Sequence, residues 1–267
     1  MTADDVSLLA HALRARAPAV PADWHIDVCA QTASTNSDLL ERRDGVPRAL
    51  FALAQTGGRG RRGRSWTAQP GASLTFSLRV RFDGRADRLS GLSLAVGVAL
   101  AEALTAQGFG GLALKWPNDL MRDTGPGAGK LGGVLIELAS TAMHTDAVIG
   151  VGLNLAPPPP GQYALSPAAL FDATPSREDW LRIAAAALDA LAVALPVFAA
   201  QGFSAFVERW NRLNLHAGRA VEVEGEMRAL GGLCVGADAY GALLLDCGDR
   251  IERVLAGDVS LCVPVRN

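Results

Sequence analysis

The segment from Gln55 to Trp66 carries four arginines among four glycines, directly after an apolar run that ends at Ala54. Glycines let backbone N–H groups approach an anion, and guanidinium groups form charge-assisted, often bidentate bonds with phosphate or carboxylate oxygens. This composition predicts a loop that handles phosphate. The alternatives are a flexible basic surface loop or an RNA-binding tract, but the formal net charge of -2 gives the chain no overall attraction for nucleic acid.

The same loop also matches the pattern G-x-G-x-x-G at Gly58, Gly60 and Gly63. In a dinucleotide-binding fold a helix must follow the last glycine of this pattern. Here Pro70 and Gly71 follow and lead into another β-type run. The context therefore argues against a nicotinamide dinucleotide site.

The segment Lys115 to Asp119 reads Lys-Trp-Pro-Asn-Asp and follows an apolar run. Pro117 stiffens this corner, so that Asn118 and Asp119 can point into a cleft. An aspartate near a triphosphate can help to hold Mg²⁺ or the ribose, and an asparagine side chain both donates and accepts hydrogen bonds. The alternative is an ordinary turn at the end of a strand.

A lysine among glycines, Lys130, begins a β-rich apolar run that continues to Glu137. The resemblance to a Walker A loop is superficial, because Thr124 stands where that motif needs a glycine and Leu131 where it needs Ser or Thr. A lone lysine at a strand start is usually solvated. The flanking glycines would let a ligand come close, so Lys130 can place a positive charge on a reacting carboxylate or α-phosphate.

Two further segments have a plain structural interpretation when taken singly. Ser34-Thr35-Asn36 is typical of a helix N-cap. The run 149–155 predicts a strand in which Gly150 and Gly152 serve close packing, before it ends at the polar Asn154.

Hydrophobic spacing predicts an α+β protein. We expect helices over residues 4–16, 89–106, 176–199 and 203–212, and strands that include 25–30, 49–54, 74–80 and 147–153. Short β runs at 220–223, 243–246 and 251–255 predict a small barrel-like module after about His216. The prolines at 157–160 predict a surface loop, which could act as a lid.

Composition limits the class of protein further. Of the 267 residues, 49% are hydrophobic and 19% charged, which is enough for a sizeable core. The apolar stretch Leu92 to Leu104 is interrupted and falls short of the about 20 residues that a membrane span needs. No secretory signal precedes the first strand, so we expect a cytoplasmic protein. The four cysteines and four histidines are scattered without metal-ligand spacing.

Taken together and in this order, the segments 34–36, 55–66, 115–119, 129–135 and 150–154 resemble the signature set of biotin protein ligases. The resemblance implies a class II synthetase-like catalytic domain over residues 1–215, with a mixed sheet flanked by helices, and an SH3-like β-barrel over 216–267. It implies that biotin and ATP, with Mg²⁺, form biotinyl-5'-AMP, from which biotin passes to a lysine of a carrier protein. The alternatives are a lipoate ligase or transferase, and a non-catalytic biotin sensor.

The resemblance also implies roles for single residues. Lys130, Arg61 and Arg59 would be catalytic, and Asp119 would contact the metal. The residues that would bind biotin are Ser34, Thr35, Asn36, Gln55, Gly58, Arg59, Trp66, Lys130, Gly132 and Gly133. The residues that would bind the nucleotide are Arg61, Arg62, Arg64, Trp66, Asn118, Asp119, Lys130 and Asn154.

The implied partner is the biotin carboxyl carrier protein or domain of a biotin-dependent carboxylase such as acetyl-CoA carboxylase. Bifunctional relatives carry a winged-helix domain before the catalytic part, and only about two dozen residues precede it here. We therefore expect no DNA partner, and the composition predicts no membrane partner. An edge strand could pair with the carrier or with a second copy, so a homodimer is one alternative that the sequence leaves open.

Overall fold

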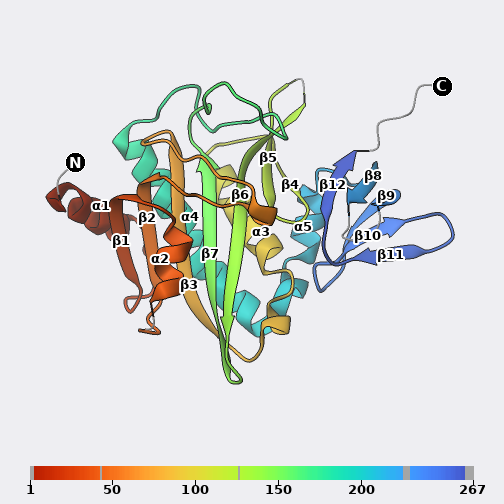
Figure 1. The fold of residues 1–267 in the computed structure, drawn as a ribbon, viewed down its shortest axis with the longest axis horizontal. Coiled ribbons are helices and arrows are strands. Elements are labelled where there is room, and N and C mark those ends of the chain that lie inside the picture. Colours follow the sequence, from red (N-terminus) through yellow and green to blue (C-terminus); the bar gives the residue numbers. More distant parts are fainter. Residues whose placement is uncertain (1–2, 43, 126, 225–228, 262–267) are drawn as a thin grey trace.

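The computed structural model describes residues 3–42, 44–125, 127–224 and 229–261, which contain two sheets (Figure 1). The first is mixed, because β1 and β2 are parallel and the other pairs antiparallel, in the order β1-β2-β3-β7-β6-β5-β4. Its strands are β1 (His25–Thr32), β2 (Arg48–Gln55), β3 (Ser73–Asp83), β4 (Leu112–Lys115), β5 (Asp119–Asp123), β6 (Ala128–Ser140) and β7 (His144–Asn154). The predicted α+β class is confirmed.

The second sheet is antiparallel and has the order β11-β10-β9-β8-β12. Its strands are β8 (Ala220–Glu224), β9 (Ala229–Ala237), β10 (Leu243–Asp246), β11 (Ile251–Val254) and β12 (Asp258–Leu261). This all-β unit matches the small β module that the sequence predicts after residue 216. It contacts the turn between β4 and β5, since the Trp116 indole donates a hydrogen bond of 3.0 Å to the Gly241 carbonyl.

Two long helices, α3 (Leu92–Ala106) and α4 (Arg177–Gln201), cover one face of the first sheet and form the core with it. On the opposite face lies the short α2 (Thr35–Glu41), while α1 (Ala3–Arg16) packs beside β1 and α4, and α5 (Val207–Leu213) leads to the second sheet (Figure 1). Ser176 caps α4, because its hydroxyl accepts from the Asp179 backbone at 3.1 Å.

The segments Ala86–Ala106 and Arg177–Ala205 are long and apolar enough to cross a membrane by composition alone. Their most apolar windows are, however, 61% and 56% buried against the rest of the protein. Helices that are apolar nearly all round are typical of a large core as well as of a membrane. Their packing on the sheet explains this composition without a bilayer.

Strand β3 separates the core from the polar face of the sheet. Its apolar residues, Leu74, Phe76 and Leu78, belong to the core. Alternate residues of a strand point to opposite faces, so the intervening Thr75 and Ser77 lie on the face that carries α2. The apolar and the polar side chains of β3 are both buried. A layer of polar side chains therefore lies between the sheet and helix α2.

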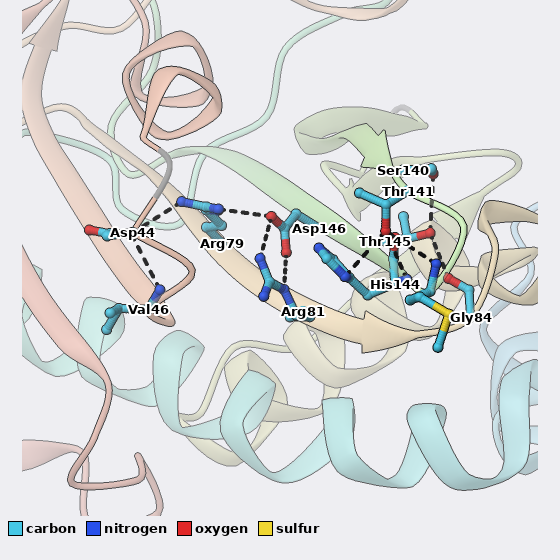
Figure 2. A network of polar contacts seen from close by, with 11 residues as sticks. Asp44, Val46, Arg79, Arg81, Gly84, Ser140, Thr141, His144, Thr145 and Asp146 are labelled. Atoms are coloured by element: carbon cyan, nitrogen blue, oxygen red, sulfur yellow. Dashed lines mark hydrogen bonds and ion pairs between the residues drawn. The ribbon is translucent and has the colours of Figure 1, made fainter.

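An ion-pair network continues this polar layer along the sheet (Figure 2). Arg79 on β3 contacts Asp146 on β7 at 2.8 Å and Asp44 at 3.2 Å, and Arg81 contacts Asp146 at 2.7 Å. The hydrogen bond from Arg81, followed by that from Arg79, lowers the pKa of Asp146 to about 2. The network joins β3 and β7, which pair over a greater length than any other two described strands of this sheet.

His216 is buried at the start of the second unit. Burial first, and then the charges of Lys115 and Arg219, lower the pKa of His216 from 6.5 to about 4. Between pH 6.5 and pH 4 this histidine is therefore protonated in the unfolded chain but neutral in the folded chain. Its contribution to the free energy of unfolding is complete above pH 6.5 and is lost as the pH falls toward 4.

We expect the free energy of unfolding to contain a His216 contribution that decreases by about 2 kcal/mol from about pH 7.5 to about pH 5. The variant His216→Gln should lack this part of the pH dependence in urea unfolding experiments. The exposed His25 provides the matched control, since His25→Gln should retain the dependence. Equal pH slopes for the wild type and His216→Gln would contradict the assignment.

Candidate active site

A cavity of about 530 Å³ lies over the polar face of the first sheet. All five sequence segments contribute to it, together with the loop after β7 and the start of β12. The predicted site residues that line it are Ser34, Thr35, Asn36, Gln55, Arg59, Arg61, Arg64, Trp66, Asn118, Asp119, Lys130, Gly133 and Asn154. The positive charges of Lys130 and three of the four loop arginines therefore converge on one cavity.

Three predicted site residues do not line this cavity. A Cβ at Gly132 would lie 2.3 Å from the Gly152 carbonyl oxygen, so the absence of a side chain there allows close contact between β6 and β7, and the role of Gly132 toward biotin stays a prediction. A Cβ at Gly58 would lie 2.4 Å from the Trp66 carbonyl oxygen. Arg62 lines a neighbouring cavity of about 410 Å³ instead.

One end of the cavity is a closed hydrogen-bond network built on the N-terminus of α2. Ser34 caps this helix, as predicted, by accepting from the Ser37 backbone at 3.4 Å. Gln55 Oε1 accepts from the Thr35 backbone at 2.8 Å and from its hydroxyl at 3.0 Å. Ser77 lies 2.7 Å from Thr35 Oγ1 and donates to Asn36 Oδ1 at 2.5 Å. These polar groups are held in fixed orientations before any ligand binds.

Two buried donors of the cavity lining, Thr75 Oγ1 and Trp66 Nε1, have no hydrogen-bond partner among the residues that the structure describes. Buried polar atoms are almost always hydrogen-bonded, and both residues line the cavity. A polar ligand is the simplest partner for them. The Trp66 ring packs over β7, where a Cβ at Gly152 would lie 2.5 Å from the indole. The predicted packing role of this glycine thus has a specific reason.

Arg59 is tied to the neighbouring strand, although it lines the cavity. Its guanidinium donates to Glu137 Oε2 at 3.0 Å and to the Ser37 hydroxyl at 3.2 Å. Asn36 donates to the same Glu137 oxygen at 2.8 Å. Glu137 therefore couples the arginine loop to the polar network of α2.

The other three loop arginines meet a single carboxylate of the second sheet, Asp258 at the start of β12. Its oxygens lie 2.7 Å from Arg64, 3.6 Å from Arg62 and 4.0 Å from Arg61. Arg62 adopts a left-handed backbone with φ 54°, which is uncommon outside glycine and needs support from its surroundings. Burial is the main cause that lowers the pKa of Arg61, and Asp258 opposes this shift.

Lys130 lines the cavity from strand β6. Its ammonium donates to Asp119 Oδ1 at 2.6 Å. Asn118 donates to the Val134 carbonyl at 2.9 Å and accepts from Arg61 at 3.5 Å, so it holds the corner against β6. A lysine, an arginine and a carboxylate are thus placed around one small volume.

The loop that follows β7 closes the cavity and is fastened to the strand of Lys130. The Lys130 backbone donates to the Ser166 carbonyl at 2.7 Å, and the Ala168 backbone donates to the Lys130 carbonyl at 2.8 Å. The Asn154 amide donates to the Ala168 carbonyl at 3.0 Å. The exposed Tyr163 lines the cavity from this loop. Asn154 therefore faces both the cavity and the loop that covers it.

The structure also brings to the site several residues for which the sequence predicts no role, namely Thr75, Ser77, Lys115, Glu137 and Asp258. Strict alternation of polar and apolar residues in β3 is a signal that could have identified the first two. No local pattern marks Asp258, because its role depends on how the second sheet packs against the first.

A metal site built from side chains is not found among the described residues, which contain no cluster of three His, Cys, Asp or Glu. Cys29, Cys234 and Cys247 are free thiols, and Cys262 lies outside the described residues. Asp119, which we predicted to contact a metal, is bonded to Lys130.

Two family models match the chain. The first, described as the biotin/lipoate A/B protein ligase family, matches residues 28–154, and the second, described as the biotin protein ligase C terminal domain, matches residues 216–262. Together they contain the five sequence segments and Asp258.

Known proteins resemble the chain over most of its length. The bifunctional ligase/repressor BirA of Escherichia coli is 33% identical over 233 residues, which are 85% of this chain and 71% of that protein. A biotin--[acetyl-CoA-carboxylase] ligase of Mycobacterium tuberculosis is 36% identical over 251 residues, 88% of either chain. The solved biotin protein ligase of Aquifex aeolicus in complex with biotin and ATP matches with a TM-score of 0.73 and 28% identity, covering 89% of this chain and 98% of that one.

Proposed function

Because the chain belongs to the biotin protein ligase family, we propose that the 530 Å³ cavity is where it joins biotin to AMP and then passes biotin to a carrier lysine. The chain is an ATP-dependent biotin ligase, and the comparisons support neither a lipoate ligase nor a non-catalytic sensor. The observation that carries the site assignment is the convergence of Lys130 and the loop arginines on one cavity beside unpaired buried donors.

The first half-reaction joins two anions, the biotin carboxylate and the α-phosphate of ATP. Their approach requires positive charge between them, and preorganised charges in a closed site supply it without reorganisation. We assign this task to Lys130 and Arg61. The donors around Thr35, Thr75 and Gln55 suit the polar ring of biotin, while Arg64, Asn118 and Asn154 suit the nucleotide.

In the second half-reaction the carrier lysine attacks the acyl carbon of biotinyl-5'-AMP, and AMP leaves. No covalent enzyme nucleophile is needed. Arg61 and the loop that contains Tyr163 enclose the place that we assign to the adenylate, so they would retain it until the carrier arrives.

Mg²⁺ would supply further charge neutralisation at the phosphates. Asp119 is the cavity carboxylate best placed to contact it, but it already accepts from Lys130. The donor set therefore fits a magnesium ion that is held mainly by the phosphates of ATP, with Asp119 as an additional contact.

For the partner we propose a biotin carboxyl carrier protein or domain, and for the location the cytoplasm. The relatives in Mycobacterium tuberculosis and Paracoccus denitrificans are named as ligases that act on acetyl-CoA carboxylase. The domain division at 215/216 is supported by the start of the second family match at residue 216. The absence of DNA and membrane partners, and the alternative of a homodimer, stay predictions.

The function is tested by two measurements on the full chain. Biotin-dependent exchange of pyrophosphate into ATP reports the first half-reaction, and labelling of a purified biotin-accepting domain reports the second. We expect both with biotin and neither with lipoate. Exchange with lipoate alone would overturn the assignment, and so would tight biotin binding without exchange or labelling.

The variant Arg61→Gly should release the adenylate. We expect biotin to appear on bystander proteins, because a free acyl adenylate reacts with any accessible lysine. The chain itself has lysine at only two positions, 115 and 130, so self-labelling should interfere little with the readout. The measurement is the ratio of biotin on the accepting domain to biotin on added serum albumin, and an unchanged ratio would contradict the role of Arg61.

A further inference from the structure

Lysine is the rare basic residue of this chain. Of its 25 basic residues only Lys115 and Lys130 are lysines, and both line the same cavity. A lysine presents a compact, strongly hydrated point charge, whereas arginine presents a broad planar fork. Lys115 ends strand β4 and lies directly opposite Asp119 in the register of β4 and β5. The function described so far gives it no task.

Among the described cations that line the cavity, Lys115 alone forms no ion pair or hydrogen bond through its charged group. Arg59, Arg61, Arg64 and Lys130 each contact a carboxylate or an amide oxygen. No hydrogen bond or ion pair joins the Lys115 ammonium to any other residue in the part of the chain that the structure describes. Burial, as the largest cause, lowers the pKa of Lys115, and nearby Lys130 and Arg64 lower it further, against Asp119 and Asp258.

A half-buried cation without a partner is costly in the free protein. An anion that enters the cavity would supply the missing counter-charge. The charged groups that influence Lys115 are Asp119, Lys130, Asp258 and Arg64. Lys115 therefore lies within electrostatic reach of the lysine that we assign to the reacting carboxylate and of an arginine of the phosphate loop, and all three line one cavity.

We propose that Lys115 binds the β- and γ-phosphates of ATP and stabilises pyrophosphate as it leaves, an inference that rests on the proposed function. In this step a biotin carboxylate oxygen bonds to the α-phosphorus, and the bond from that phosphorus to the oxygen bridging to the β-phosphate breaks. The electron pair stays on the pyrophosphate oxygen, to which the Lys115 ammonium donates a hydrogen bond. No proton needs to be transferred. Lys115 then has no role in the second half-reaction, from which pyrophosphate is absent.

The test compares Lys115→Met with Lys115→Arg in the full chain and measures the two half-reactions separately. We expect Lys115→Met to raise the KM for pyrophosphate in the exchange reaction by about 10-fold or more, as the loss of one charge-assisted contact does. The rate of transfer from chemically prepared biotinyl-5'-AMP to the accepting domain should stay within about two-fold of the wild-type rate. This change is much smaller than the about 10-fold effect expected in the exchange reaction. Lys115→Arg should recover part of the exchange rate.

Thermal unfolding of both variants checks that the fold is retained. Equal losses in exchange and transfer, or an unchanged KM for pyrophosphate, would overturn the role of Lys115. If instead the wild type showed no biotin-dependent exchange, the proposed site chemistry itself would fail. The two failures are therefore distinguishable.

Discussion

Replacing Lys130 by alanine should slow adenylate formation by about 10²-fold or more, because the variant loses a preorganised charge at the place where two anions react. The same change leaves Asp119 without the ammonium that lies 2.6 Å away, so a carboxylate would face the incoming phosphates. Both effects act in the same direction. The measurement is the initial rate of biotin-dependent pyrophosphate exchange at saturating ATP.

The variant Asp119→Asn separates these two effects, since it removes the carboxylate and keeps the lysine. The double variant with Lys130→Ala and Asp119→Asn should recover part of the lost rate if the unpaired carboxylate contributes. Backbone bonds from Lys130 to Ser166 and Ala168 do not depend on the side chain, so the covering loop should stay in place. Near-normal exchange by Lys130→Ala would remove this residue from the mechanism.

Reversing the charge of Asp258 should lower adenylate formation by about 10-fold to 100-fold, mainly through a higher KM for ATP. Asp258→Lys turns three attractions, at 2.7, 3.6 and 4.0 Å, into three repulsions within the arginine loop. The added lysine would by itself attract the negatively charged ATP. We expect the loss of loop geometry to outweigh this attraction, because salt screens the attraction between charges that are exposed to solvent.

Asp249 provides a matched control in the same unit. It is largely exposed and pairs only with the neighbouring Arg250 among the described residues. Asp249→Lys makes the same change of charge away from the cavity, and we expect wild-type kinetics. If Asp258→Lys and Asp249→Lys behave alike, the second unit does not support the arginine loop.

Much of the site could be predicted from the sequence because its chemistry is concentrated in short segments. The dense arginines and glycines of residues 57–64 and the isolated Lys130 are informative without neighbours, since few other roles require those residue types together. Helix caps at Ser34 and Ser176 are local as well, and both are present. The mixed α+β class followed from the spacing of apolar residues.

The contacts that decide how these residues work depend on residues far apart in the chain. Asp258 meets the arginine loop across 194 residues, Glu137 meets Arg59 across 78, and Asn36 meets Glu137 across 101. Local propensity cannot encode such pairs, because sheet order and the packing of the second sheet determine them. In the same way, only the register of β6 opposite β7 shows which neighbour a side chain at Gly132 would meet.

The sequence by itself therefore determined which chemical groups this protein has and which family of reactions they suit. Tertiary structure alone decided which charges are paired and which are free, and so separated Lys130, bonded to Asp119, from Lys115, which has no partner among the described residues. The physical reason is that a charge in a partly buried cavity is governed by the carboxylates within a few ångströms of it, and the fold, rather than the spacing along the chain, sets those distances.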